Sequence, residues 1–110
     1  MNSSELIKIG FTKVTKTDDR DVSGGYAGDM LSWVMGRAKA GEVWFTIVSN
    51  INTIAVASLV EVSAIVICDS VTLDETVIKR ATEEGINVYY TNLSVYNAAV
   101  RFNELFTGNE

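Results

Sequence analysis

The chain has 110 residues, of which 47% are hydrophobic and 21% charged; this composition predicts a single globular domain over residues 1–110 and excludes a disordered chain. The net charge is −5 and the nine Lys and Arg residues are scattered, which excludes a nucleic-acid partner because phosphate binding needs clustered cations. The most apolar stretch, residues 54–68, is interrupted by polar residues and too short to cross a bilayer, so we expect no membrane partner.

The first part of the chain predicts two helices separated by extended segments and glycines. Gly10 and Gly41 stand where helices usually end. In chain order we expect a helix over residues 4–9, extended segments over residues 11–16 and 20–23 joined by a hairpin-like turn at residues 17–19, a tight turn at Gly24-Gly25, and a helix over residues 27–40.

The rest of the chain alternates between strands and helices. In chain order we expect a strand over residues 43–48, a helix capped by Asn50 or Asn52 and ending near residue 60, a buried strand over residues 64–68, a helix from the capping box Thr72–Glu75 to residue 84, a strand over residues 87–90, and a helix from Ser94 to residue 106. This alternation predicts a mostly parallel sheet with right-handed crossovers and flanking helices, a three-layer α/β/α fold. The N-terminal extended segments are expected to extend that sheet or pack on its edge.

The glycines at positions 24, 25 and 28 stand between an extended segment and a helix. Paired glycines suit a backbone with positive φ or a closely approaching group. A strand, a glycine turn and a helix in this order would present free N–H groups to an anion. The alternative is a plain tight turn, and Asp29 favours it because a carboxylate already complements the helix dipole.

The residues around this turn resemble the DRTGG domain family. The resemblance begins at Asp19-Arg20-x-Val22-Ser23-Gly24-Gly25-Tyr26, continues over residues 28–38, 41–44 and 54–59, and returns at residues 91–94, so that it covers roughly residues 4–106. Ser23 replaces the Thr of the family name and keeps the hydroxyl. Members are bacterial and archaeal modules attached to phosphotransacetylases, CBS-domain pyrophosphatases or HPr kinases. The resemblance implies a stand-alone, non-catalytic regulatory or oligomer-forming module.

Ligand sites in parallel sheets lie beyond the carboxyl ends of the strands. A small anionic or nucleotide-like ligand is therefore expected between Arg20, Ser23, Gly24 and Asn50, with Arg20 supplying charge-assisted hydrogen bonds. The alternative for the two asparagines at positions 50 and 52 is helix capping alone. The complete set of candidate ligand-binding residues is Arg20, Ser23, Gly24, Gly25, Asn50, Asn52, Asp69, Thr91 and Asn92.

The sequence offers little for catalysis. It contains no histidine, which removes the commonest general base and metal ligand, and no P-loop motif. Cys68, the single cysteine, is expected to be a buried apolar residue, and together with the absence of a recognisable leader it indicates a cytoplasmic location. We expect no catalytic residue, no metal and no cofactor. The alternative is a hydrolase or phosphate acceptor that uses Asp69 or Ser70.

Two helices carry more apolar surface than one sheet face can cover. Tyr26, Trp33 and Arg37 form a stripe separate from the core-facing residues, and these residue types are favoured at interfaces. The helix over residues 51–60 is apolar nearly all round. We expect a homodimer through one of these surfaces. The alternatives are that the rings cover the N-terminal extended segment, or that the chain is a pure interaction module docking onto a metabolic enzyme.

Overall fold

Five strands form a sheet in the order β1-β5-β4-β3-β2, in which β1 runs antiparallel to β5 and the other pairs are parallel. The computed structural model describes residues 1–108. The strands are β1 (Thr12–Lys13), β2 (Gly24–Ala27), β3 (Glu42–Thr46), β4 (Ala64–Ile67) and β5 (Val88–Tyr90). The predicted mostly parallel sheet is confirmed.

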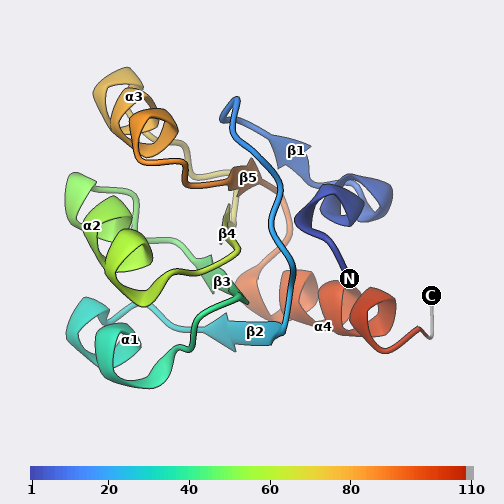
Figure 1. The fold of residues 1–110 in the computed structure, drawn as a ribbon. Helices are drawn as coiled ribbons and strands as arrows, with labels where there is room; N and C mark the ends of the chain where they lie inside the picture. The colour runs from blue at the N-terminus through green and yellow to red at the C-terminus, as the bar shows by residue number, and fades with distance from the viewer. Residues whose placement is uncertain (109–110) are drawn as a thin grey trace.

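Helices cover both faces of this sheet (Figure 1). One face carries α1 (Leu31–Arg37), α2 (Ile51–Val60) and α3 (Glu75–Glu83), and the other carries α4 (Val95–Phe106) with the 3-10 helix η1 (Ser3–Ile9). The helices of the first face follow successive right-handed crossovers, which place them side by side. The three-layer α/β/α arrangement predicted from the sequence is therefore confirmed. None of the helices described over residues 1–108 is long and apolar enough to span a bilayer.

The central strands β3 and β4 are buried on both faces and divide the core in two. Trp44 and Ile65 belong to the cluster under α1, α2 and α3. Their chain neighbours Phe45 and Val66 belong to the cluster under α4 and η1, where the rings of Phe45 and Phe102 lie 5.4 Å apart. Successive side chains of a strand point to opposite faces, so a short apolar run fills both halves of the core.

The expected hairpin between the two N-terminal extended segments is wrong. β1 and β2 lie at opposite edges of the sheet, and residues 14–23, here called the crossing segment, run between them past the amino ends of the parallel strands (Figure 1). The segment begins with Val14, whose N–H donates to Val88 O, and ends with Ser23, whose N–H donates to Gly41 O. Its polar side chains have tertiary partners, whereas a hairpin would pair its two arms with each other.

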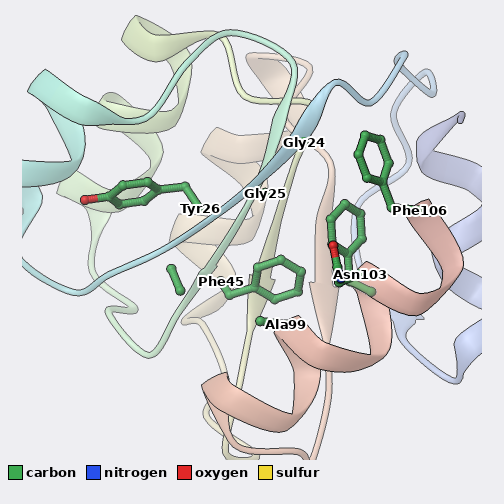
Figure 2. A pocket seen from close by; sticks show the side chains of 9 residues that line it. Gly24, Gly25, Tyr26, Phe45, Ala99, Asn103 and Phe106 are labelled. Carbon is green, nitrogen blue, oxygen red and sulfur yellow. The ribbon is translucent and has the colours of Figure 1, made fainter.

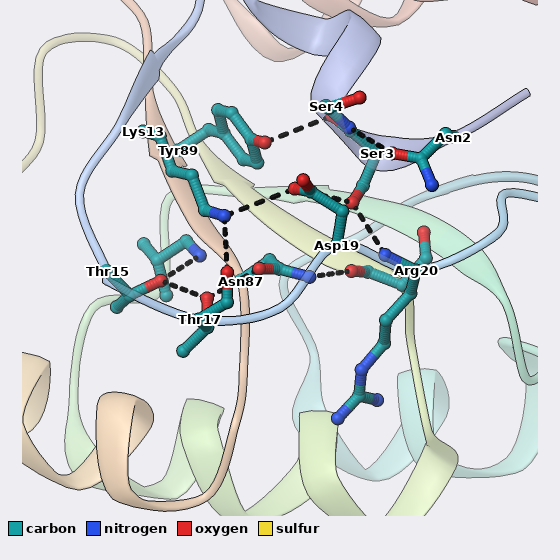
Figure 3. Close-up of polar contacts among 12 residues, drawn as sticks. Asn2, Ser3, Ser4, Lys13, Thr15, Thr17, Asp19, Arg20, Asn87 and Tyr89 are labelled. Atoms are coloured by element: carbon teal, nitrogen blue, oxygen red, sulfur yellow. Dashed lines mark hydrogen bonds and ion pairs between the residues drawn. The ribbon is translucent and has the colours of Figure 1, made fainter.

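Polar side chains attach the crossing segment to η1 and to β5 (Figure 3). Lys13 Nζ forms an ion pair of 3.2 Å with Asp19, and the Arg20 N–H donates to Ser3 Oγ at 2.9 Å. The Tyr89 hydroxyl donates to Ser3 O at 3.0 Å from within the core. The N-terminal 3-10 helix, the crossing segment and strand β5 are therefore held together as one polar cluster.

The predicted glycine turn is also wrong, because Gly24 and Gly25 lie in strand β2 and neither has a positive φ. A Cβ built on Gly25 would lie 3.0 Å from Cε2 of Phe102, so the glycine gives room to an aromatic ring of α4. The helix begins at Leu31 rather than at residue 27, and its N-cap makes no side-chain hydrogen bond. Asp29 instead accepts hydrogen bonds from Thr46 Oγ1 at 2.7 Å and from the Ile47 N–H.

Helix capping agrees with the sequence at two helices and differs at a third. The Asn50 side chain accepts from the Asn52 N–H at the start of α2, and Ser94 accepts from the Asn97 N–H at the start of α4. The capping box expected at Thr72 is wrong, because α3 begins at Glu75 after the N-cap residue Asp74, whose side chain makes no cap hydrogen bond.

We predict that Gly25→Val destabilises the protein by about 1–3 kcal/mol, because the new Cβ lies too close to the buried ring of Phe102. Urea unfolding measures the difference. Gly24→Val is the matched control in the same strand, since a Cβ at Gly24 meets only the flexible side chain of Glu42, at 3.5 Å. Equal stability of the two variants would contradict a packing requirement at Gly25.

Candidate functional site

Polar residues gather where β4 and β5 end. The Asp69 N–H donates to Leu93 O at 2.8 Å and the Ser70 N–H donates to Thr91 O at 3.1 Å. The Ser70 hydroxyl donates to Asn92 Oδ1 at 2.8 Å. Asp69 and Ser70 both have positive φ, 58° and 60°, a conformation that non-glycine residues rarely adopt. The backbone turns sharply here and links the ends of the two strands.

The place of this cluster in the sheet is typical of ligand sites. After β4 the chain enters α3 on one face of the sheet, and after β5 it enters α4 on the opposite face (Figure 1). Adjacent parallel strands whose connections diverge in this way form a topological switch point, which is where open α/β sheets usually bind ligands. Asp69, Thr91 and Asn92, three of the predicted site residues, lie at that point.

A hollow of about 430 Å³ opens beside the end of β5, between η1 and α4. We call it the basic hollow; it is lined by Lys8, Ile9, Gly10, Thr91, Asn92, Leu93 and Arg101. Two cations line it and no carboxylate of residues 1–108 does, although the chain has 14 acidic and nine basic residues. Glu104 lines an adjoining hollow that shares Arg101. The basic hollow therefore favours anions locally, against the net charge of the protein.

The two cations of the basic hollow form few ion pairs or hydrogen bonds with the other described residues, so they are available to a ligand. Lys8 Nζ lies 3.7 Å from Glu5, a long and exposed contact within η1. The guanidinium of Arg101 forms no ion pair or hydrogen bond within residues 1–108. Sequence reasoning missed both residues, because they come from elements at opposite ends of the chain and no motif surrounds either of them.

The structure does not bring together the four residues expected to share an anion. Arg20 donates to Val62 O at 3.3 Å and to Gly85 O at 3.0 Å, and Ser23 Oγ donates to Ala40 O. These carbonyls lie at the amino ends of the strands, whereas Asn50 follows the carboxyl end of β3. The expected placement between Arg20 and Asn50 is wrong because the crossing segment carries Arg20 along the opposite edge of the sheet.

The remaining predicted ligand residues lie apart from the basic hollow. Asn50 and Asn52 open α2, where the Asn50 side chain serves as its cap. Gly24 and Gly25 line a separate hollow of about 290 Å³ between β2 and α4 (Figure 2). Phe45, Ala99, Phe102, Asn103 and Phe106 form much of its wall. Four aromatic rings line this second hollow, and none of its lining residues within the described chain is charged.

A third hollow, of about 390 Å³, lies on the other side of β2 and includes Tyr26, Met30 and Trp33. Trp33 is 53% exposed, and the guanidinium of Arg37 lies 4.1 Å from its ring centroid. Trp33 and Arg37 of the predicted stripe thus lie together on α1, whereas Tyr26 lies in strand β2 and lines the same hollow as Trp33. Since half of the Trp33 side chain faces solvent, the ring does not simply cover the crossing segment.

The nucleophilic side chains near the switch point are not activated. Burial raises the pKa of the Cys68 thiol to about 12, and the neighbouring Asp69 carboxylate adds to the shift. The Ser70 hydroxyl donates to the amide oxygen of Asn92, a group that cannot accept a proton as a general base does. No group of three or more acidic, His or Cys side chains within residues 1–108 is placed to hold a metal ion.

Comparison with known proteins shows the fold and no more. No family model and no curated protein match the chain. A similar solved structure contains the CBS and DRTGG domains of the regulatory region of Clostridium perfringens pyrophosphatase, complexed with its activator, diadenosine tetraphosphate. Its TM-score is 0.60 at 16% identity, and the match covers 69% of this chain and 33% of the other. The chain thus has a DRTGG-like fold and spans about a third of that regulatory region.

Proposed function

We propose that this protein is a non-catalytic regulatory module that senses a small anionic, nucleotide-like ligand and acts as a homodimer. The observation that carries the proposal is the basic hollow at the switch point of the sheet, which Lys8 and Arg101 line together with no carboxylate from the described part of the chain. Its volume of about 430 Å³ lies within the ordinary range for small-molecule sites.

The polar groups of the basic hollow suit phosphate or carboxylate oxygens. Arg101 offers a planar fork of donors, and Lys8 offers a mobile point charge. The Asn92 side-chain oxygen already accepts from Ser70, which leaves the amide nitrogen as a donor. A nucleotide-like ligand is favoured because the similar regulatory region binds diadenosine tetraphosphate.

A regulatory role is favoured over catalysis by the state of the reactive groups. The Cys68 thiol remains protonated at neutral pH, and Ser70 lacks a base, so neither is ready to attack a substrate. The similar structure is likewise a regulatory region. A hydrolase or phosphate acceptor using Asp69 or Ser70 is the less favoured alternative, and a ligand-free module that docks onto a metabolic enzyme is the second.

The homodimer is supported by the apolar surface of α1. Met30 and Trp33 are exposed beside Arg37, and tryptophan and arginine are the residue types that most often dominate binding energy. The helix α2 offers a rival surface, because Leu59 is 68% exposed and Ile51 is also exposed. Its other side is buried against the sheet through Ile54 and Ala57.

We predict that Arg101→Gln and Lys8→Gln each weaken ligand binding about tenfold or more, because each removes a charge-assisted hydrogen bond. Isothermal titration calorimetry with ATP, diadenosine tetraphosphate and pyrophosphate measures the effect. Lys79→Gln is the control, since it removes the same charge from an exposed position of α3. Binding that survives both substitutions contradicts the site, and binding of none of the three probes favours the ligand-free interaction module.

We predict a wild-type dimer at micromolar concentration that Trp33→Glu converts to monomers, because the substitution places an unpaired charge in the interface. Light scattering measures the mass against the 12.0 kDa of one chain. Leu59→Glu is the matched variant on α2 and is expected to leave the dimer intact. Loss of the dimer only with Leu59→Glu would move the interface to α2, and a wild-type monomer would contradict the homodimer.

A further inference from the structure

Strand β2 ends the sheet, and no strand within residues 1–108 pairs with its outer hydrogen-bonding groups. The Gly28 N–H donates to Phe45 O, and in a parallel ladder alternate residues face the neighbouring strand. The backbone N–H and C=O groups of Tyr26 therefore point toward β3, while those of Gly25 and Ala27 point away from the sheet. Both residues are exposed. The outer edge of β2 is a template onto which another strand can pair.

β2 lacks the features that normally protect an edge strand. Natural edges are protected by very short strands, charged residues, proline, bulges or covering segments. The opposite edge follows this rule, since β1 has two residues and one of them is Lys13. The sequence of β2 is Gly-Gly-Tyr-Ala, without charge, proline or bulge. The outer edge of β2 is therefore available for pairing with another strand.

Apolar hollows lie on both sides of this edge. On the α4 side, the ring of Phe106 stacks on Phe102 at 5.5 Å beside the hollow that Gly25 lines (Figure 2). On the α1 side, Tyr26 and Trp33 line the other hollow. A monomer exposes both, and the stripe of residues 26, 33 and 37 continues directly from the open strand.

We propose that β2 pairs antiparallel with β2 of a second copy about a two-fold axis at Tyr26, joining the two sheets into one. Gly25 and Ala27 lie symmetrically about Tyr26. Gly25 of each copy would therefore exchange N–H···O bonds with Ala27 of the other copy. The inference rests on the homodimer of the proposed function and specifies how it forms. Tyr26 would face its own symmetry mate across the axis as a non-hydrogen-bonded pair.

A second copy fits this edge through charge and size. The helix α1 runs from the carboxyl edge, near Asp29, to the amino edge, where Arg37 lies. The two-fold axis of an antiparallel pair reverses the direction of α1 in the second copy. Arg37 of each copy would therefore lie toward Asp29 of the other copy. Gly25 and Ala27 face α4 with almost no side chain, which leaves room for the α4 helices to approach. Gly25 would thus serve both the Phe102 packing and the pairing of copies.

Ala27→Pro tests the proposal because it removes an N–H that points away from β3 and leaves the β2–β3 ladder intact. Ala27→Ser is the matched control, since it changes the side chain and keeps the N–H. Sedimentation equilibrium is expected to show a dimer dissociation constant at least about tenfold higher for Ala27→Pro than for Ala27→Ser. Circular dichroism checks that both variants are folded.

Tyr26→Cys provides a second measurement that does not depend on a proline. Non-hydrogen-bonded antiparallel pairs have Cα atoms about 4.5 Å apart, within the range of a disulfide. Mild oxidation is expected to link Tyr26→Cys chains into covalent dimers and to leave Met35→Cys, an exposed position on α1, largely unlinked.

The outcomes separate this inference from the homodimer itself. A dimer that tolerates Ala27→Pro and forms no Tyr26→Cys crosslink would overturn the edge pairing and leave the homodimer standing. A monomeric wild type would overturn both, and the open edge would then belong to a strand of another protein.

Discussion

The path of the crossing segment determines which parts of the sheet are covered and which stay open. Because β1 and β2 are consecutive in the chain but lie at opposite edges of the sheet, residues 14–23 must run past the amino ends of the strands between them. Arg20 fixes this path by donating to Val62 O and Gly85 O, and Thr15 Oγ1 donates to Ile86 O at 2.9 Å. The arginine at the start of the family-like motif is therefore structural.

This path leaves two regions of the sheet available for binding. The amino ends are covered by the crossing segment, while the carboxyl ends retain the basic hollow beside Thr91 and Asn92. The outer edge of β2 remains open, with apolar hollows on both of its sides. In the proposed module the ligand binds at the carboxyl edge and the second copy pairs at β2. The switch-point loops and α4 connect the two regions, since Arg101 and Phe102 are neighbours on that helix.

The sequence predicts well what local pattern determines. The strands and helices after residue 43 follow from periodicity and from caps such as Asn50 and Ser94, and the rule on strand ends locates Asp69, Thr91 and Asn92. The errors come from long-range contacts. Paired glycines such as Gly24 and Gly25 are typical of turns. Here Gly25 is needed because a side chain would collide with the ring of Phe102 in α4, which no local pattern reveals. Lys8 and Arg101 line the same hollow only in the folded chain.

Residue-specific amide hydrogen exchange detects the pairing of β2 with a second copy without any substitution. If the strands pair, the amides of Gly25 and Ala27 exchange slowly at high protein concentration and rapidly on dilution, because only the dimer supplies their acceptors. The Tyr26 amide, which faces β3, is expected to exchange slowly at both concentrations. Rapid exchange of Gly25 and Ala27 at a concentration where the protein is dimeric would contradict the account.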